Sequence, residues 1–232
     1  VMGCGMYSLV PDLGVCYIKD NFEGEVNNIE TFTEMASDDS GAILSLAGWK
    51  SFVLDNAGAA NLSVLQNVTK STEAPPSVYP LEERCLISYC EYGQQWCVRE
   101  CNANGNTLKK SQTFLHDKNG EKYCQVRCFF LLPNFVFALF YVIFNFFIQF
   151  FSRWKFLQPL LIKYHSIFSL GMVSEADLPE GGFVKYVIVA KGWDSGDQPS
   201  SVSKPPNKTK ILKIHFSGSG YALTALSLVC AA

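Results

Sequence analysis

The sequence predicts an α+β fold, in which helices accompany a mixed or antiparallel sheet and one apolar helical segment is inserted. Residues 182–191 and 209–216 alternate between apolar and polar side chains, as half-buried strands do. Residues 42–54 and 220–232 carry apolar side chains at helical spacing. Residues 129–151 contain no charged side chain and form an apolar run too long for an ordinary soluble core.

Composition limits the class of function. A chain of 232 residues is long enough for one large domain or two small ones. Its net charge of -2, with 17% charged residues, provides no basic field that would attract nucleic-acid phosphates. We therefore expect no nucleic-acid partner.

The first half of the chain has three recognisable segments. Residues 26–35 partly alternate and predict a strand, which the helix at 42–54 follows. Residues 71–80 are rich in Pro and Ser and predict an extended loop, because proline donates no backbone hydrogen bond. Asn119-Gly120 suits a tight turn, so residues 113–116 and 122–130 are predicted to form a hairpin.

The apolar run from Phe129 to Phe151 carries the strongest signal. A bilayer core requires about 20 such residues as a helix. Pro133 falls where the first turn of a helix tolerates it, while Asn134 interrupts the run with a polar side chain. The side chains expected to contact lipid are Phe129, Phe135, Phe140, Phe147 and Phe151. A buried helix of a large soluble protein is the alternative interpretation.

Basic residues flank this run, with Arg127 before it and Arg153 and Lys155 after it. This pattern suits a segment whose two ends remain on the cytosolic side. The following stretch, 156–173, is broken by Pro159 and is expected to lie at the membrane interface. Because folded sequence stands on both sides, a re-entrant or monotopic insertion is favoured over a single crossing.

The remaining segments complete the predicted fold. The strands at 182–191 and 209–216 are separated by a polar Gly/Pro/Ser loop, so they predict an antiparallel hairpin with a long connection. The helix at 220–232 follows at once. It ends without a capping residue, and the chain begins on an apolar segment, so further sequence is expected at both ends.

The nine cysteines lack the paired spacing of a zinc site and are interpreted as buried, reduced thiols, so no metal is expected. Three glycosylation triplets, at Asn61, Asn67 and Asn207, have meaning only in the secretory lumen. A disulfide-bonded, glycosylated surface protein with one membrane crossing therefore stays as an alternative class.

No complete catalytic motif occurs in the sequence, which lacks G-x-S-x-G, H-E-x-x-H and G-x-G-x-x-G. No catalytic residue is assigned on this basis. The segment Gly3-Cys4-Gly5 is too short for a phosphate loop. It could still place backbone amides near a ligand at a helix that starts around Pro11 or Asp12.

Several separated patches resemble, in the same order, the saccharopine dehydrogenase-like oxidoreductases. GCGMYSLVPDLGV at 3–15 resembles the family's G-x-G-F-D-S-x-P-x-D-L-G segment, and GWKS at 48–51 resembles its G-T-x-x-S helix. The end of the chain is similar to G-P-E-x-G-Y-x-x-T-P, with Gly220, Tyr221 and Thr224 in place. Together with weaker patches between them, these matches span nearly the whole chain.

The resemblance implies the C-terminal domain of a Rossmann-type dehydrogenase, acting on an unknown small molecule with NAD or NADP bound by an upstream half that this sequence does not contain. It also implies a cleft lined by residues near the start of the chain and by an opposing helix: Gly3, Gly5, Ser8, Asp12, Gly14, Trp49, Lys50 and Ser51. Alternatively, Asp12 only caps a helix and Gly14 only permits close packing. Where the family pattern has Phe-Asp, this chain has Met6-Tyr7, and the lost carboxylate puts its chemistry in doubt.

These observations predict four segments. Residues 1–20 would end the nucleotide-binding half, 21–128 and 174–232 would form the α+β domain, and 129–173 would be the inserted lipid-binding segment. The expected function is the C-terminal part of an oxidoreductase held on the cytosolic face of a membrane or lipid droplet and inactive by itself. A homo-oligomer is a candidate assembly. The alternative is a non-enzymatic lipid-surface protein that retains the fold.

Overall fold

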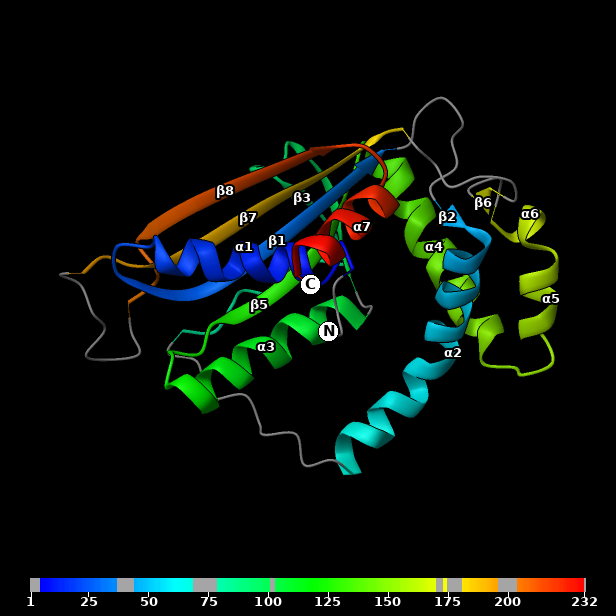
Figure 1. Cartoon of the computed structure of the whole chain (residues 1–232), viewed down its shortest axis with the longest axis horizontal. Helices are drawn as coiled ribbons and strands as arrows, with labels where there is room; N and C mark the ends of the chain where they lie inside the picture. The colour runs from blue at the N-terminus through cyan, green and yellow to red at the C-terminus, as the bar shows by residue number, and fades with distance from the viewer. Residues whose placement is uncertain are drawn as a thin grey trace.

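The computed structural model describes residues 5–36, 44–68, 79–100, 103–169, 173–174, 181–195 and 204–231. A mixed sheet of six strands, in the order β3-β4-β5-β1-β7-β8, forms its centre (Figure 1). The strands are β1 (Glu25–Ala36), β3 (Ile87–Cys90), β4 (Gln95–Arg99), β5 (Gln125–Leu132), β7 (Phe183–Trp193) and β8 (Lys208–Ser217). Two short strands, β2 (Leu44–Ser45) and β6 (Val173–Ser174), pair separately.

Seven helices accompany the sheet in the described parts of the chain. They are α1 (Leu9–Asp20), α2 (Leu46–Val68), α3 (Ala103–Asn119), α4 (Phe135–Ser152), α5 (Gln158–Lys163), α6 (His165–Phe168) and α7 (Gly220–Ala231). Helices α2, α5 and α6 lie beyond one end of the sheet (Figure 1). The predicted α+β class with a mixed sheet is therefore confirmed at this level.

Three predicted strands are confirmed. The alternating segments at 26–35, 182–191 and 209–216 become β1, β7 and β8. β7 runs antiparallel to both β1 and β8, as the predicted hairpin requires. β1 pairs on its other side with β5 in parallel, which makes the sheet mixed.

One face of the sheet is covered by α1, α3 and α7 (Figure 1). Val15 and Ile18 of α1 pack with Ile29 and Ile188 of the central strands, and Leu223 of α7 joins the same cluster. All five side chains are at most 7% exposed. This apolar layer supplies the main hydrophobic driving force of the fold.

The opposite face is partly polar. Phe32 and Phe129 stack there with their ring centroids 5.2 Å apart, and the Arg84 guanidinium lies 5.5 Å and 5.7 Å from the two ring centres. Arg84 donates two hydrogen bonds, of 2.7 Å and 2.8 Å, to the carboxylate of Glu30. The pair satisfies a carboxylate whose side chain is 3% exposed.

The predicted hairpin around Asn119-Gly120 is wrong. Residues 113–116 belong to α3, and β5 pairs with β1 and β4 instead. Gly120 has φ +67° and its N–H donates to the carbonyl of His116, which is the left-handed cap that ends many helices. The same positive φ that favours a tight turn thus ends a helix here.

The apolar run also divides differently from the prediction. Its first residues, including Phe129, belong to β5, and Phe129 is 2% exposed, so this side chain lies in the core and not in a lipid-facing helix. Asn134 separates the two elements, because its Oδ1 accepts the N–H of Phe137 and caps α4. The helical part of the predicted insertion therefore starts at Phe135.

The second helix is longer than predicted. It begins after Ser45, whose Oγ accepts the N–H of Gly48, and continues to Val68. The predicted loop at 71–80 lies mostly outside the described residues, and Tyr79 and Pro80 have no regular structure.

Candidate functional site

Helix α4 exposes an apolar surface along its whole length. The exposed fractions of Val136, Ile143 and Phe146 are 72%, 58% and 70%, and further exposed apolar side chains are Phe135, Phe137, Leu139, Phe140, Phe147 and Phe150. The helix has 18 residues, which is long and apolar enough to cross a membrane, yet only 17% of it is buried. Contiguous apolar surfaces of this extent mark sites of association in folded proteins.

A narrow stripe on the other side of α4 attaches the helix to the domain. Ala138, Ile148 and Ser152 are buried, and Ile148 packs in a cluster with Trp49 and Val53 of α2 and Leu161 of α5. One side of α4 therefore packs on the domain, and the other side is exposed.

Both ends of α4 are also held by the domain. At its start, the Phe135 ring meets Trp96 of β4 at 5.0 Å between centroids. Past its end, α5 returns to α2, where the Trp49 indole N–H donates to the Leu161 carbonyl over 3.0 Å. Exposed Lys50 and Asp55 stand on the outer side of α2. A transmembrane orientation of α4 would carry the charged helix beside it into hydrocarbon.

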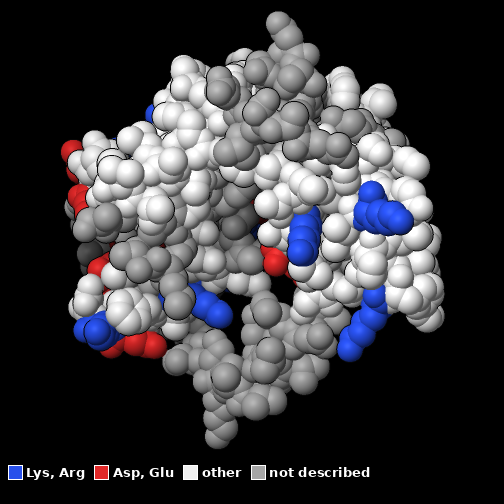
Figure 2. Space-filling view, turned by 45° about the vertical axis from the view of Figure 1, so that its right-hand side comes forward, with Lys and Arg blue, Asp and Glu red and all other residues white. Residues whose placement is uncertain are grey.

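Helices α5 and α6 continue the apolar surface. Trp154, Phe156, Leu160, Tyr164 and Ile167 are exposed, with Phe156 at 72%. We call the exposed apolar side chains of α4, of α5, of α6 and of the 153–157 connection the α4–α6 surface. Figure 2 brings this side of the molecule forward and shows broad uncharged areas with separate Lys or Arg side chains and few acidic ones.

Of the five side chains predicted to contact lipid, three lie on this surface. Phe135, Phe140 and Phe147 are 46%, 45% and 42% exposed, while Phe151 is half-buried in the cluster around Trp49. Phe129 lies in the sheet, as described above.

A second feature is the junction where α7 meets the starts of α1 and α2. The Met6 N–H donates to Thr224 Oγ1 over 3.2 Å, and the Tyr186 hydroxyl donates to the Met6 carbonyl over 2.8 Å. On the other side of α7, the Tyr221 hydroxyl accepts the Ser45 N–H over 2.7 Å. Three patches that lie far apart in the sequence thus meet around one helix.

Tyr7 is half-buried within this junction. Its hydroxyl donates to the Met35 sulfur over 3.0 Å, and its ring meets Phe130 edge-on at 6.0 Å. Burial, followed by the nearby Glu100 carboxylate, raises the pKa of Tyr7 well above its ordinary value, and the same two causes raise the pKa of Tyr186. Both phenols are protonated at neutral pH and serve as hydrogen-bond donors, not as bases.

The residues at the start of α1 do not fit a dinucleotide. A phosphate at a helix N-terminus needs free backbone N–H groups and little side-chain cover. Here the Met6 N–H is engaged by Thr224, and the Met6 side chain packs against Gly220. The Ser8 N–H donates to the Gly5 carbonyl, and α1 starts at Leu9. Gly3 lies outside the described residues.

Asp12 and Gly14 have structural environments on α1. Asp12 Oδ2 accepts the Ser111 hydroxyl of α3 over 2.9 Å, and burial raises the pKa of the Asp12 carboxyl. A Cβ on Gly14 would lie 2.3 Å from Cδ1 of Ile188, so glycine allows α1 to approach β7 closely. The Gly14 contact fits the close-packing alternative, whereas Asp12 lies inside α1, bonds to α3 and does not cap the helix.

The candidates on α2 point in different directions. Trp49 is 1% exposed and packs toward α4 and α5, whereas Lys50 and Ser51 are exposed on the outer side. α7 stands between the start of α2 and the start of α1, since it contacts both. The cleft predicted between the two helices stays a prediction.

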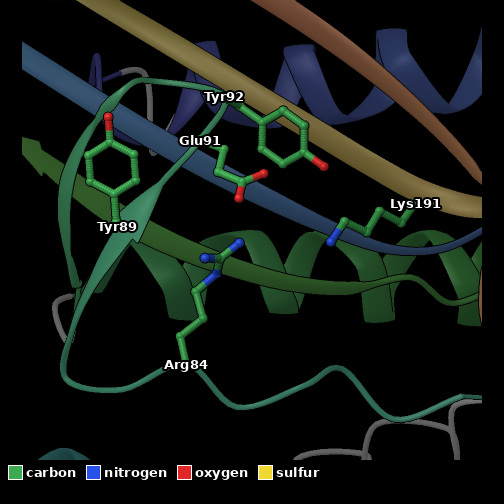
Figure 3. A pocket seen from close by; sticks show the side chains of 5 residues that line it. All are labelled: Arg84, Tyr89, Glu91, Tyr92 and Lys191. Atoms are coloured by element: carbon green, nitrogen blue, oxygen red, sulfur yellow. The ribbon is translucent and has the colours of Figure 1, made fainter.

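A shallow cavity of about 210 Å³ lies on the opposite face of the sheet. In Figure 3 the charged ends of Arg84, Glu91 and Lys191 point toward the same space, and Tyr89 and Tyr92 stand beside it. Glu30 neutralises Arg84, while Glu91 and Lys191 carry opposite charges. The cavity is thus electrically balanced and suits a small polar group.

The described cysteines are free thiols. Cys90, Cys97, Cys124 and Cys128 are buried, as predicted for thiols that serve as small apolar side chains. The prediction is wrong for Cys85 and Cys230, which are exposed, and Cys16 is half-buried. Burial raises the pKa of Cys124 and Cys128 to about 12, which keeps both protonated. Among the described residues, no group of three or more His, Cys, Asp and Glu is arranged to hold a metal ion.

Sequence reasoning missed several residues of the junction. Tyr186 lies inside a strand predicted from alternation, and Met35 lies near the end of another strand, so neither residue stood out from its pattern. Tyr221 and Thr224 carried a signal, because the family resemblance retained both positions, but nothing in the sequence linked them to Met6 or Ser45.

Five curated proteins resemble the chain over 98% of its length. They include the "Saccharopine dehydrogenase-like oxidoreductase" of Bos taurus, 25% identical over 233 residues, and that of Homo sapiens, 24% identical over 236 residues. The chain spans 54% of the length of each. The predicted resemblance to these oxidoreductases is therefore confirmed.

A shorter match is found with the "Lipid droplet localized protein" of Caenorhabditis elegans. It is 35% identical over 60 residues, which is 26% of this chain and 14% of that protein. No protein-family model matches the chain. No solved structure matches it either.

Proposed function

Because the chain is similar over nearly its whole length to saccharopine dehydrogenase-like oxidoreductases, we propose that it is the lipid-binding part of an oxidoreductase of this kind. The α4–α6 surface inserts into one leaflet of a membrane or into the monolayer of a lipid droplet, while the sheet remains in the cytosol. The observation that carries this proposal is the exposed apolar side of α4, a helix of which only 17% is buried.

Lipid is the environment that suits this surface, because its outermost side chains are large, apolar and continuous over α4 and α5. Fully burying a phenylalanine-sized side chain contributes about 1.5–3 kcal/mol, so several together give stable attachment. The match to a nematode protein named for its lipid-droplet location supports the droplet as one such surface.

The geometry favours a helix that lies in the interface over one that crosses the bilayer. α4 packs on α2 through Ile148, and its first ring contacts Trp96. The following helix α5 is bonded to α2, because the Trp49 indole N–H donates to the Leu161 carbonyl. An interfacial helix needs one apolar side only, which is what α4 offers. We therefore propose monotopic attachment, with both flanks of α4 on the cytosolic side.

The proposed reaction is an oxidation or reduction that uses NAD or NADP. Because α7 covers the start of α1, we place the dinucleotide on residues outside this chain. Titration of residues 1–232 with NADH and NADPH should therefore give no binding. Binding of either dinucleotide to these residues would contradict this assignment. Sequence preceding Val1 should contain a glycine-rich strand-to-helix turn, and its absence there would end the oxidoreductase proposal.

Tyr7 favours a second candidate, a lipid-surface protein that retains the fold without the reaction. The tyrosine stands where the family pattern has an acid, and its hydroxyl is engaged by Met35. With its pKa raised, Tyr7 cannot replace a carboxylate as a base near neutral pH. If the natural protein binds NADH or NADPH but oxidises or reduces no substrate, this candidate is favoured.

Lipid attachment is tested by flotation of the full chain with phosphatidylcholine vesicles and with a phospholipid-coated triglyceride emulsion. The double variant F140S/F146S should bind at least about tenfold more weakly to both, since two exposed phenylalanines are lost. The matched control is L13S/Y17S, which removes two side chains on α1 that are each 59% exposed. An equal loss in both variants would contradict the proposed surface.

A further inference from the structure

The charges within the α4–α6 surface all have one sign. No Asp or Glu occurs between Glu121 and Glu175. Arg153, Lys155 and Lys163 are the cations from α4 to α6, and all three are exposed. The charges that the segment from α4 to α6 itself contributes are therefore all positive, which is complementary to a layer that is apolar inside and negatively charged at its border.

The cations are placed at one end of the surface. Arg153 and Lys155 alternate with Trp154 and Phe156, which are 52% and 72% exposed. Long basic side chains beside exposed aromatic rings are typical of the membrane interface, where the ring enters the lipid and the charge stays at the head groups. Lys163 adds a third charge next to the exposed Tyr164 ring, 5.6 Å from its centre.

The opposite end of α4 differs from the sequence expectation. Arg127 does not flank the helix, because it lies in β5 and donates hydrogen bonds to the carbonyls of Leu81 and Glu82. The start of α4 is capped by the uncharged Asn134. Positive charge is therefore concentrated where α4 passes into α5.

From this charge distribution we infer that the α4–α6 surface binds anionic phospholipid, with Arg153, Lys155 and Lys163 at the head groups and the exposed apolar side chains below them. The inference rests on the proposed lipid attachment and adds the class of lipid. The cytosolic leaflet of cell membranes carries such lipids, and each basic residue near it strengthens binding about fivefold at low salt.

The test is flotation of the full chain with vesicles of phosphatidylcholine alone and with vesicles that contain phosphatidylserine as well. The wild type should bind the serine-containing vesicles at least about tenfold more tightly, and the preference should shrink in high salt. The variant R153Q/K155Q/K163Q should lose this preference and retain wild-type binding to phosphatidylcholine. The control K109Q/K110Q/K118Q removes three exposed lysines of α3 and should keep the preference.

The outcomes separate the two proposals. Binding to both vesicle types without a preference, or a preference retained in R153Q/K155Q/K163Q, would overturn the inference and leave lipid attachment in place. An equal loss in the α3 control would also overturn it, because net charge would then explain the effect. If the wild type binds neither vesicle type nor the phospholipid-coated emulsion, lipid attachment itself is wrong.

Discussion

Helices α3 and α4 are nearly equal in length, at 17 and 18 residues, but they differ in the kind of side chain that they expose to solvent. α3 buries Leu108 and Gln112 against the domain and exposes lysines. α4 buries Ala138 and Ile148 and exposes Phe146 and its neighbours. Water suits the first arrangement better than the second, and this difference supports the proposal that α4 contacts lipid.

The largest difference in the free energy of unfolding should lie between a substitution in the β5 part of the apolar run and one in its α4 part. Phe129→Ala should lower the free energy of unfolding by about 3–5 kcal/mol, because the ring is fully packed against Phe32. Phe147→Ala should have a much smaller effect. Urea denaturation of the full chain in mild detergent measures both, and equal effects would contradict the division of the run at Asn134.

The two faces of α4 should also differ in their contribution to stability. Ile148→Ala should cost about 2–5 kcal/mol, since it opens a cavity beside Trp49. Phe146→Ala should change the free energy of unfolding by less than about 0.5 kcal/mol, as expected for an exposed site. A large loss for Phe146→Ala would indicate that this face is covered by protein.

The end of α3 predicts a smaller effect. Gly120→Ala should destabilise the fold by about 1 kcal/mol, because alanine is strained at φ +67°. Gly58 lies inside α2 with open space around it, so Gly58→Ala should instead stabilise by about 0.5–1 kcal/mol. Thermal unfolding of both variants tests this. The melting temperature should fall for Gly120→Ala and rise for Gly58→Ala, and changes of the same sign would contradict it.

The smallest effect concerns pH. Hydrogen bonds from Lys19 and Asn119 lower the pKa of Glu121 below its ordinary value. The ionised carboxylate therefore stabilises the folded state above the unfolded-state pKa, and this contribution is lost as the pH falls through the folded-state pKa. Glu121→Gln should cost about 0.2–1 kcal/mol at neutral pH, since the pair is partly exposed, and nothing below that acidic window. A loss that persists in acid would contradict the assignment.

The long strands β1, β7 and β8 were predictable from the sequence, whereas the short strands β3 and β4 were not predicted. β8 alternates because one of its faces packs toward the helices and the other is exposed, while β7 is apolar on both faces between positions 186 and 190. The boundary at Asn134 was missed because β5 is covered on both faces, and such a strand is as continuously apolar as a buried helix. The helix α3 was missed because Asn-Gly suits both a hairpin and a helix end.

The candidate site was predictable only in part. The apolar surface of α4 follows from composition, since a helix with phenylalanine on most faces must expose some of them. The junction around α7 depends on contacts such as Met6 with Thr224, which are 218 positions apart in the chain. Local pattern and spacing carry no information about such a pair.

The orientation of α4 is the central claim, and residues Val136, Ile143 and Phe150 test it because all three are on its exposed face. A ketone-bearing amino acid at each position, coupled to a hydroxylamine nitroxide, avoids the native cysteines. Depth measurements by spin-label accessibility on vesicles should give the same depth, below the head groups, at all three positions. Ile143 deeper than the two ends by about 10 Å, as in a crossing helix, or labels that all remain in water, would contradict interfacial attachment.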